Sequence, residues 1–179
     1  MQAINHEAKV SYRAAAQTLG EGQYNLIRPK QDKIISVLDY VNLRKSGWLV
    51  SPVVDGYLDN IRLLGMDPLT LPSSFLFSNA NLTSSISGND FFEVLITNEN
   101  TSKNFGPNVK VIIDKNVAPG MAVGDISLVQ RLLNKNSITY LIVNPTQPLE
   151  QTKLEEITPH LAIINTCLLY TSPSPRDRN

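Results

Sequence analysis

The sequence predicts an α+β fold, and three observations lead to that class. First, residues 47–72 (GWLVSPVVDGYLDNIRLLGMDPLTLP) have the composition of a β-hairpin, with Val, Trp, Tyr, Ile and Leu bounded by Gly, Asp, Asn and Pro. Second, strand-like stretches alternate with stretches of helical periodicity on both sides of this hairpin. Third, 179 residues with 42% hydrophobic content suffice for one domain, or two small lobes, with a hydrophobic core.

The first 22 residues are predicted to form a separate helix. Residues 4–19 carry apolar side chains at helical spacing, and Gly20 and Gly22 end the pattern. The stripe consists of Ile4, Ala8, Ser11/Tyr12, Ala15 and Leu19. Its alanine content indicates close packing against one neighbour, and a plain surface helix is equally compatible with these residues.

Residues 23–45 are predicted to form a short strand followed by a helix. The strand covers residues 23–29, and the helix covers residues 33–45 with Asp32 as its N-cap. Spacing places Ile34, Leu38 and Val41 on one face of this helix with Ile35 beside them, and we expect this face to be buried.

The hairpin that follows is expected to consist of strands at residues 48–57 and 61–65. The dipeptide Asp59-Asn60 forms its turn, because both residue types accept positive φ. Pro52 has no N–H to donate to a ladder, so we expect it at a strand edge or a bulge.

Residues 69–90 have a different composition, rich in Ser, Asn, Pro and Thr. We expect a long loop that leads into strands at residues 91–97 and 108–114, where Val109, Val111 and Ile113 share one face.

Residues 120–166 return to alternating strands and helices. The expected order is a strand at 121–123, a helix at 126–133 capped by Asp125, a strand at 138–144, a helix at 149–157 capped by Thr146, and a strand at 161–164. We therefore predict two small lobes of mixed sheet with helices packed on one face. Residues 23–68 and 120–166 would form the lobes, and residues 69–119 an insert.

The charge balance excludes several classes of protein. With 16 basic and 16 acidic residues the chain has no net charge, which argues against a nucleic-acid partner and against a polybasic membrane-surface protein. Apolar runs are only a few residues long, such as residues 161–164, far short of the roughly 20 that span a bilayer.

The C-terminal residues 167–179 are expected to be foreign to the fold. The sequence CLLYTSPSPRD looks like a translated sequencing adapter, so the biological sequence would end near Thr166. The alternative is a natural tail rich in Ser and Pro. If the tail is foreign, the single cysteine, Cys167, is lost with it, and the remaining thiol-free chain suits an oxidising compartment.

No residue pattern predicts a catalytic, cofactor-binding or metal site. The aspartates at 55, 59, 67, 114 and 125 lack metal-ligand spacing, and turns or helix caps account for residues 59, 67 and 125. His6 and His160 are the only histidines, and neither Gly-x-Ser-x-Gly nor a glycine-rich phosphate loop is present. We therefore expect no enzymatic activity, no cofactor and no metal.

Five aromatic residues are expected in the core or on a sheet face, in preference to a base-stacking platform. This applies to Trp48, Tyr24, Tyr40, Tyr57 and Tyr140. Phe75, Phe77, Phe91 and Phe92 leave two alternatives open. They would either pack under a loop, which we favour, or form an exposed apolar patch for a lipophilic cargo or a partner.

Several stretches resemble one known family of proteins. The segments "GW-VSPVV-G-L" and "RLLG-DPLTLP" of residues 47–72 resemble the extracytoplasmic part of FtsX-like ABC-transporter permeases, the MacB-type periplasmic core. The opening "A-VSYRAAAQTL", the segment "DISLVQRLLNKNSITYLIV" and the segment "VNPTQPLEQTKLEEITPHLAI" are similar to further parts of that family, in the same order. Residues 75–118 match it poorly.

The resemblance implies a concrete function. Residues 1–22 would be a stalk that continues a missing transmembrane helix, residues 23–166 a periplasmic core domain, and three more membrane helices would follow. The parent would be a permease of a bacterial inner membrane, with this segment on the periplasmic side. A separate cytoplasmic ATP-binding subunit would hydrolyse ATP, and the permease would transmit that work to a lipophilic or protein cargo. A second permease copy or a periplasmic protein would be further partners.

One alternative from another class stays open. The same residues are compatible with a freestanding soluble periplasmic binding or adaptor domain that has no enzymatic activity. A natural start at Met1 and a stop soon after Thr166 would favour that alternative.

Overall fold

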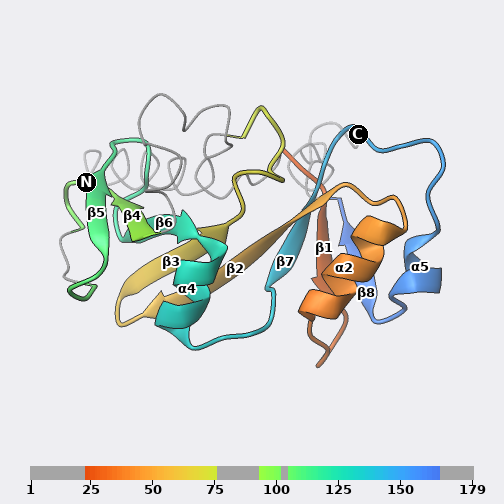
Figure 1. The fold of residues 1–179 in the computed structure, drawn as a ribbon, viewed down its shortest axis with the longest axis horizontal. Helices are drawn as coiled ribbons and strands as arrows, with labels where there is room; N and C mark the ends of the chain where they lie inside the picture. The colour runs from red at the N-terminus through yellow and green to blue at the C-terminus, as the bar shows by residue number, and fades with distance from the viewer. Residues whose placement is uncertain (1–22, 76–92, 102–104, 166–179) are drawn as a thin grey trace, which may run out of the picture.

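The computed structural model describes residues 23–75, 93–101 and 105–165, and its described strands form one mixed eight-stranded sheet (Figure 1). The strand order is β5-β4-β6-β3-β2-β7-β1-β8, in which the pairs β3–β6 and β4–β5 are parallel and the other neighbours antiparallel. The strands are β1 Leu26–Pro29, β2 Val50–Leu58, β3 Ile61–Met66, β4 Val94–Thr97, β5 Lys110–Ile113, β6 Met121–Asp125, β7 Tyr140–Val143 and β8 Leu161–Ile164. The helices are α2 Val37–Lys45, α4 Ile126–Leu133 and α5 Leu154–Ile157. The α+β class is thus confirmed.

The predicted hairpin lies at the centre of the sheet. Strands β2 and β3 pair from Val53↔Met66 to Leu58↔Ile61, and the two-residue connection contains Asp59 at a φ of 54°. Asp tolerates this left-handed conformation better than most residues, which explains why the turn forms without glycine at that position. The predicted hairpin and its turn are confirmed.

Pro52 lies inside the sheet, because β2 has a strand on each side, but the side that Pro52 faces is unpaired at this residue, as at a strand edge. The register pairs Pro52 with Leu141 of β7, inside the ladder. The backbone carbonyls of Leu49 and Val53 accept hydrogen bonds from the N–H groups of Asn144 and Thr139, which flank β7. The backbone N–H and C=O groups of odd-numbered residues of β2 therefore point toward β7, and the backbone nitrogen of Pro52 points toward the β3 side. Pairing with β3 begins only at Val53, so the missing N–H of Pro52 points past the end of that strand and no ladder bond is lost.

The helices cover one face of the sheet, as predicted. Strand residues on that face contact α2, α5 and α4, and they include Val50, Leu141 and Leu63. Alternate strand residues, such as Val53 and Ile142, point to the opposite face. On that opposite face Leu71, Phe75, Val117 and Ala118 from connecting segments pack against the strands.

The start and the buried face of the first described helix differ from the expectation. Helix α2 begins at Val37 with Ser36 as its N-cap, whereas Asp32 lies in the preceding turn at a φ of 58°. A capping box fixes this start: the Ser36 hydroxyl accepts from the Asp39 N–H at 3.0 Å, and the Asp39 carboxylate accepts from the Ser36 N–H at 2.9 Å.

The later start of α2 changes which side chains are buried. Ile35 is held before the helix by a bridge to Ile138, and Leu43 and the half-buried Tyr40 face the core. Ile34 and Leu38, which we expected inside, are exposed together with Val37. Of the predicted apolar stripe, Leu38 on α2 and Ile34 before it face solvent, and Val41 is half-buried.

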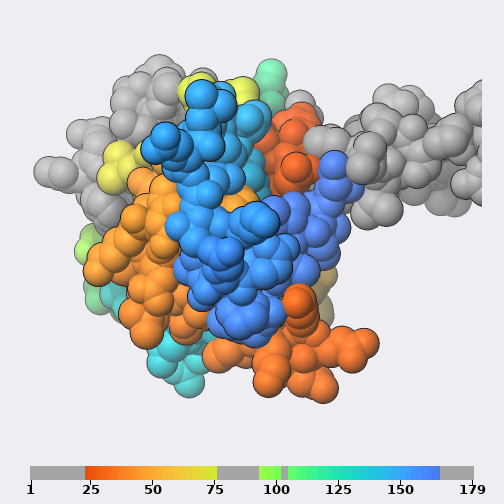
Figure 2. All heavy atoms as spheres, turned by 90° about the vertical axis from the view of Figure 1, so that its right-hand side faces the viewer, coloured from red at the N-terminus to blue at the C-terminus, as the bar shows by residue number. Residues whose placement is uncertain are grey.

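Helix α4 agrees with the prediction and α5 is shorter than predicted. Asp125 caps α4, but α5 begins at Leu154 and Thr146 is not its N-cap. The Gln147 side chain instead donates to the Leu49 carbonyl at 2.8 Å and accepts from the Leu49 N–H at 3.0 Å. This exchange ties the segment after β7 to the residue that precedes β2. Figure 2 shows the α5 region (blue) lying against the α2 region (orange) at this end of the molecule.

The described strands of the two expected lobes are continuous in one sheet. Strands from residues 23–68 and 120–166 occupy neighbouring places from β6 to β8, and β4 and β5 from the predicted insert add to one edge. The division into lobes stays a prediction. The expected helix at residues 4–19 and the tail at residues 167–179 lie outside the described residues. Within the described ranges, no helix has the length and apolar character of a bilayer-crossing segment.

Candidate functional site

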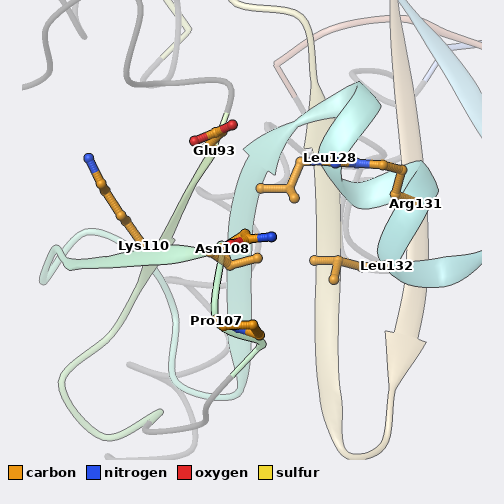
Figure 3. A pocket seen from close by; sticks show the side chains of 8 residues that line it. Glu93, Pro107, Asn108, Lys110, Leu128, Arg131 and Leu132 are labelled. Atoms are coloured by element: carbon orange, nitrogen blue, oxygen red, sulfur yellow. The ribbon is translucent and has the colours of Figure 1, made fainter.

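A groove of about 450 Å³ lies between α4 and the turn that precedes β5. Figure 3 shows Leu128 and Leu132 on α4 pointing across the groove toward Asn108 and Pro107. The lining residues are Glu93, Pro107, Asn108, Val109, Lys110, Leu128, Arg131 and Leu132. None of them was singled out as a candidate from the sequence, because they come from three segments that only the fold brings together.

The chemistry of the groove favours binding over reaction. Its floor is apolar, and Glu93, Lys110 and Arg131 supply charges around it. No cysteine or histidine lines it, so it offers neither a thiolate nor an imidazole base. An apolar side chain or a short acyl group flanked by polar atoms fits this arrangement.

Asp55, one of the aspartates considered from the sequence, is paired with Arg62. The Arg62 guanidinium donates to both carboxylate oxygens, at 2.9 Å and 2.6 Å, across the β2–β3 hairpin. These hydrogen bonds raise the pKa of Arg62 and keep it charged. The pair is partly buried on the face opposite the helices and joins the two central strands.

The remaining aspartates have turn and cap functions. Asp67 accepts from the Leu69 N–H at 3.1 Å, and Asp114 accepts from the Asn116 N–H at 2.8 Å. Asp125 accepts from the Ser127 N–H at 2.9 Å at the start of α4. Burial raises the pKa of Asp125, although its hydrogen bonds to Ser127 and Leu128 oppose that shift. Asp59 occupies the hairpin turn. Of these carboxylates, Asp67 lies near enough to Asp125 for its negative charge to help raise the pKa of Asp125.

His160 contacts Asp39, the residue that completes the capping box of α2. Its Nε2 lies 2.9 Å from the Asp39 carboxylate, which also caps α2. Burial alone would raise the pKa of Asp39, but the hydrogen bonds with His160 and Ser36 outweigh it and leave that pKa lowered. The contact ties α2 to the start of β8. His6 lies outside the described residues.

Most of the described aromatic side chains are in the core, as predicted. Trp48 donates to the Thr152 carbonyl at 2.7 Å, and Tyr24 lies 5.6 Å from Phe75 between ring centroids. The Arg28 guanidinium lies 4.8 Å from the centroid of the buried Tyr140 ring. Tyr57 is the exception and is exposed. Phe75 is buried, which for this residue confirms the packing alternative. Phe77, Phe91 and Phe92 lie outside the described residues.

Two glycines of the hairpin allow α4 to lie close to the sheet. A Cβ on Gly65 would lie 2.8 Å from the Val129 Cβ and 3.0 Å from the Ile126 Cα. A Cβ on Gly56 would lie 2.8 Å from the Leu133 Cδ1. The hairpin and α4, which are more than 60 residues apart in sequence, thus form one closely packed unit.

No metal cluster of three or more His, Cys, Asp or Glu side chains occurs in the part of the chain that the structure describes.

No protein-family model and no curated protein matches the chain. Among solved structures, the chain is similar to the periplasmic region of MacB from Actinobacillus actinomycetemcomitans, with 11% identity and a TM-score of 0.48 over 89% of this chain and 97% of that one. It is also similar to the extracellular domain of the noncanonic ABC-type transporter YknZ from Gram-positive bacteria, with 12% identity and a TM-score of 0.43 over 79% of this chain and 99% of that one. The domain type named by the sequence resemblance, a MacB-type periplasmic core, is also found among these solved structures.

Proposed function

We propose that this chain is the extracytoplasmic domain of an FtsX-like ABC-transporter permease. The observation that carries the proposal is the packing of the segments that resemble the family. The hairpin of residues 47–72 and the segment of residues 125–143 contact each other through α4, β2, β3 and β7. Segments far apart in sequence thus resemble one family and form one structural unit, with Gly56 and Gly65 at the contact.

The domain acts in this proposal by coupling and contact, without catalysis of its own. A separate cytoplasmic subunit hydrolyses ATP, and the membrane part, with one helix before this segment and three after it, carries the movement to the periplasmic side. The cargo is lipophilic or a protein. The roles of the charged residues support this reading, because Asp55, Asp125 and Asp39 are occupied in pairing and capping.

The experiment that tests the proposal is the recovery of the intact gene on both sides of the sequence. We expect an apolar run of about 20 residues before Met1, three such runs after Thr166, and a gene for an ATP-binding subunit nearby. A reading frame that starts at Met1 and stops soon after Thr166, without apolar runs, would refute the permease proposal. A freestanding binding or adaptor domain would then take its place.

A second test uses the recovered proteins. The intact permease, purified in detergent with the neighbouring ATP-binding protein, should retain that protein through affinity purification. A permease with its membrane helices deleted, leaving only this domain, serves as the control and should lose it. Retention by the isolated domain would contradict a coupling role through the membrane.

A further inference from the structure

Strand β5 is an exposed edge of the sheet. It is the outermost strand on the left of Figure 1, and β4 is its only neighbour among the described strands. The exposed fractions of Val111, Ile112 and Ile113 are 41%, 37% and 64%. Although β5 has only four residues and begins with Lys110, its β-branched residues leave N–H and C=O groups that are unpaired within the described part of the chain and can pair with another strand.

The backbone of β5 presents two residues to a new strand. The Asp114 N–H donates to the Thr97 carbonyl of β4 at 2.8 Å. The backbone N–H and C=O groups of the even-numbered residues of this stretch therefore point toward β4. The N–H and carbonyl groups of Val111 and Ile113 therefore point away from the sheet. Within the described residues, no strand pairs with them.

The sequence of this edge is complementary to itself. In an antiparallel pair of two β5 strands centred on Ile112, Val111 lies opposite Ile113 of the second copy. These are the residues with outward backbone groups, so each such pair exchanges both N–H···O bonds. In the same register Lys110 lies opposite Asp114 of the second copy, which places opposite charges at both ends of the pairing.

Neighbouring registers lose this match. Centring on Val111 places Lys110 opposite Ile112 and Asp114 opposite Asn108, and centring on Ile113 places Asp114 opposite Ile112. The other edge strand, β8, has no such complementarity, since His160 and Asn165 flank it. Figure 3 shows the Lys110 side chain extending away from the groove leucines, which leaves it accessible to a second copy.

We propose that two copies of this chain associate by antiparallel pairing of their β5 strands, which joins their sheets into one. The proposal does not depend on the transporter function. A contact through one short strand is smaller than the roughly 1,200 Å² lower limit of stable interfaces, so we expect a weak, reversible dimer with a Kd of about 0.1–1 mM. Joining both copies to one membrane would strengthen it through effective concentration.

The test is sedimentation equilibrium of the full chain from about 10 µM to 1 mM, with reductant present because of Cys167. Val111→Pro removes an outward N–H and should abolish the dimer, while leaving the β4 pairing that uses even-numbered residues. Ile163→Lys on the opposite edge is the matched control and should leave the dimer unchanged.

A charge exchange distinguishes pairing from unfolding. Lys110→Asp places two acidic residues opposite each other and should weaken association about 3- to 10-fold. The double variant Lys110→Asp with Asp114→Lys restores opposite charges and should recover the affinity. Hydrogen exchange gives an independent measurement: the amides of Val111 and Ile113 should become protected as concentration rises.

Three results would overturn the proposal. One is a monomer throughout the concentration range, and another is a dimer weakened by Ile163→Lys but not by Val111→Pro. The third is amide protection at Val111 and Ile113 that does not change with concentration, because that would mean that their groups are already bonded within one chain. Recovery of the affinity by the exchanged charges, together with loss in Val111→Pro, would support it.

Discussion

Arg62 donates to both oxygens of Asp55 across the central hairpin, and the two residues are diagonal neighbours in the β2–β3 register. The Asp55 side chain is 14% exposed and that of Arg62 30% exposed, so solvent screens the pair only in part. The pair fixes the two strands that also support α4 on the opposite face. It is therefore a determinant of the stability of the sheet centre.

Breaking this pair should cost more than breaking an exposed ion pair. We expect a coupling of about 1–2 kcal/mol between Asp55→Asn and Arg62→Met, because a bidentate and partly buried pair exceeds the usual exposed value. The measurement is a double-mutant cycle on the free energy of unfolding in urea. Asp59→Asn, which keeps a residue that tolerates the left-handed turn, is the control and should change little. A coupling below about 0.3 kcal/mol would show that solvent screening removes the interaction.

The capping aspartate of α4 leads to a prediction with two opposite outcomes. Asp125→Asn keeps an oxygen that accepts from the Ser127 N–H and removes a buried charge, so we expect a protein up to about 1 kcal/mol more stable at pH 7. Asp125→Ala loses the cap and should be about 1 kcal/mol less stable. Urea unfolding of both variants measures the difference.

The pH dependence gives the sign of the Asp125 effect. Because burial raises the folded-state pKa above the ordinary value of 3.8, ionisation costs stability as the pH rises between the unfolded and folded pKa values. The advantage of the asparagine variant should therefore grow from about pH 3 toward neutral pH and then stay constant. An advantage that shrinks as the pH rises would contradict the raised pKa.

The fold was predictable where local pattern and tertiary contacts agree. The hairpin, its turn and α4 have both a local sequence signal and a matching place in the sheet. Helix α2 shows the opposite case: Leu38 on the helix and Ile34 just before it face solvent, because the capping box and the Ile35 bridge fix a different start and rotation. Periodicity identifies an apolar face but does not say which neighbour it meets.

The candidate site was not predictable from the sequence. Glu93, Asn108 and Arg131 are ordinary surface residue types in separate segments, and the groove exists only because β4 and β5 add to the sheet beside α4. The place of Pro52 inside the sheet was not predictable for a related reason. Only the register shows that the side of β2 toward β3 has no partner at Pro52, whereas the other side pairs with β7.

The Asp39–His160 contact predicts a loss of stability in acid. The folded-state pKa of Asp39 is lowered, so its carboxylate stabilises the fold above the unfolded pKa of about 3.9, and that contribution is lost as the pH falls through the lower folded value. Asp39→Asn should cost up to about 1 kcal/mol at pH 5, and the difference from the parent chain should vanish toward pH 2. Asp32→Asn, at an exposed left-handed turn position, is the control.

The measurement for Asp39 is urea unfolding of the parent chain and both variants between pH 5 and pH 2. A difference between the parent and Asp39→Asn that persists unchanged at pH 2 would mean that shape or capping, and not charge, is responsible. The Asp32→Asn variant should follow the parent chain throughout.

The contact between the hairpin and α4 leads to the last prediction. Gly65→Ala would place a methyl group 2.8 Å from the Val129 Cβ and 3.0 Å from the Ile126 Cα, a backbone atom that cannot rotate away. We expect a loss of about 1–3 kcal/mol, as for other overpacked sites. Gly56→Ala should cost less, because its closest neighbours are the ends of the Leu133 and Lys135 side chains, which can move.

A second substitution identifies the source of the Gly65 effect. Val129→Ala removes the Cγ1 that would lie 3.3 Å from the new methyl group, but it keeps the Cβ that would lie 2.8 Å from it. Because the contacts with the Val129 Cβ and the Ile126 Cα remain, the double variant should lose close to the sum of the single losses in urea unfolding. A loss about 1 kcal/mol smaller than that sum would mean that the γ-methyl groups of Val129, and not the Cβ and backbone contacts, limit how closely α4 approaches the hairpin.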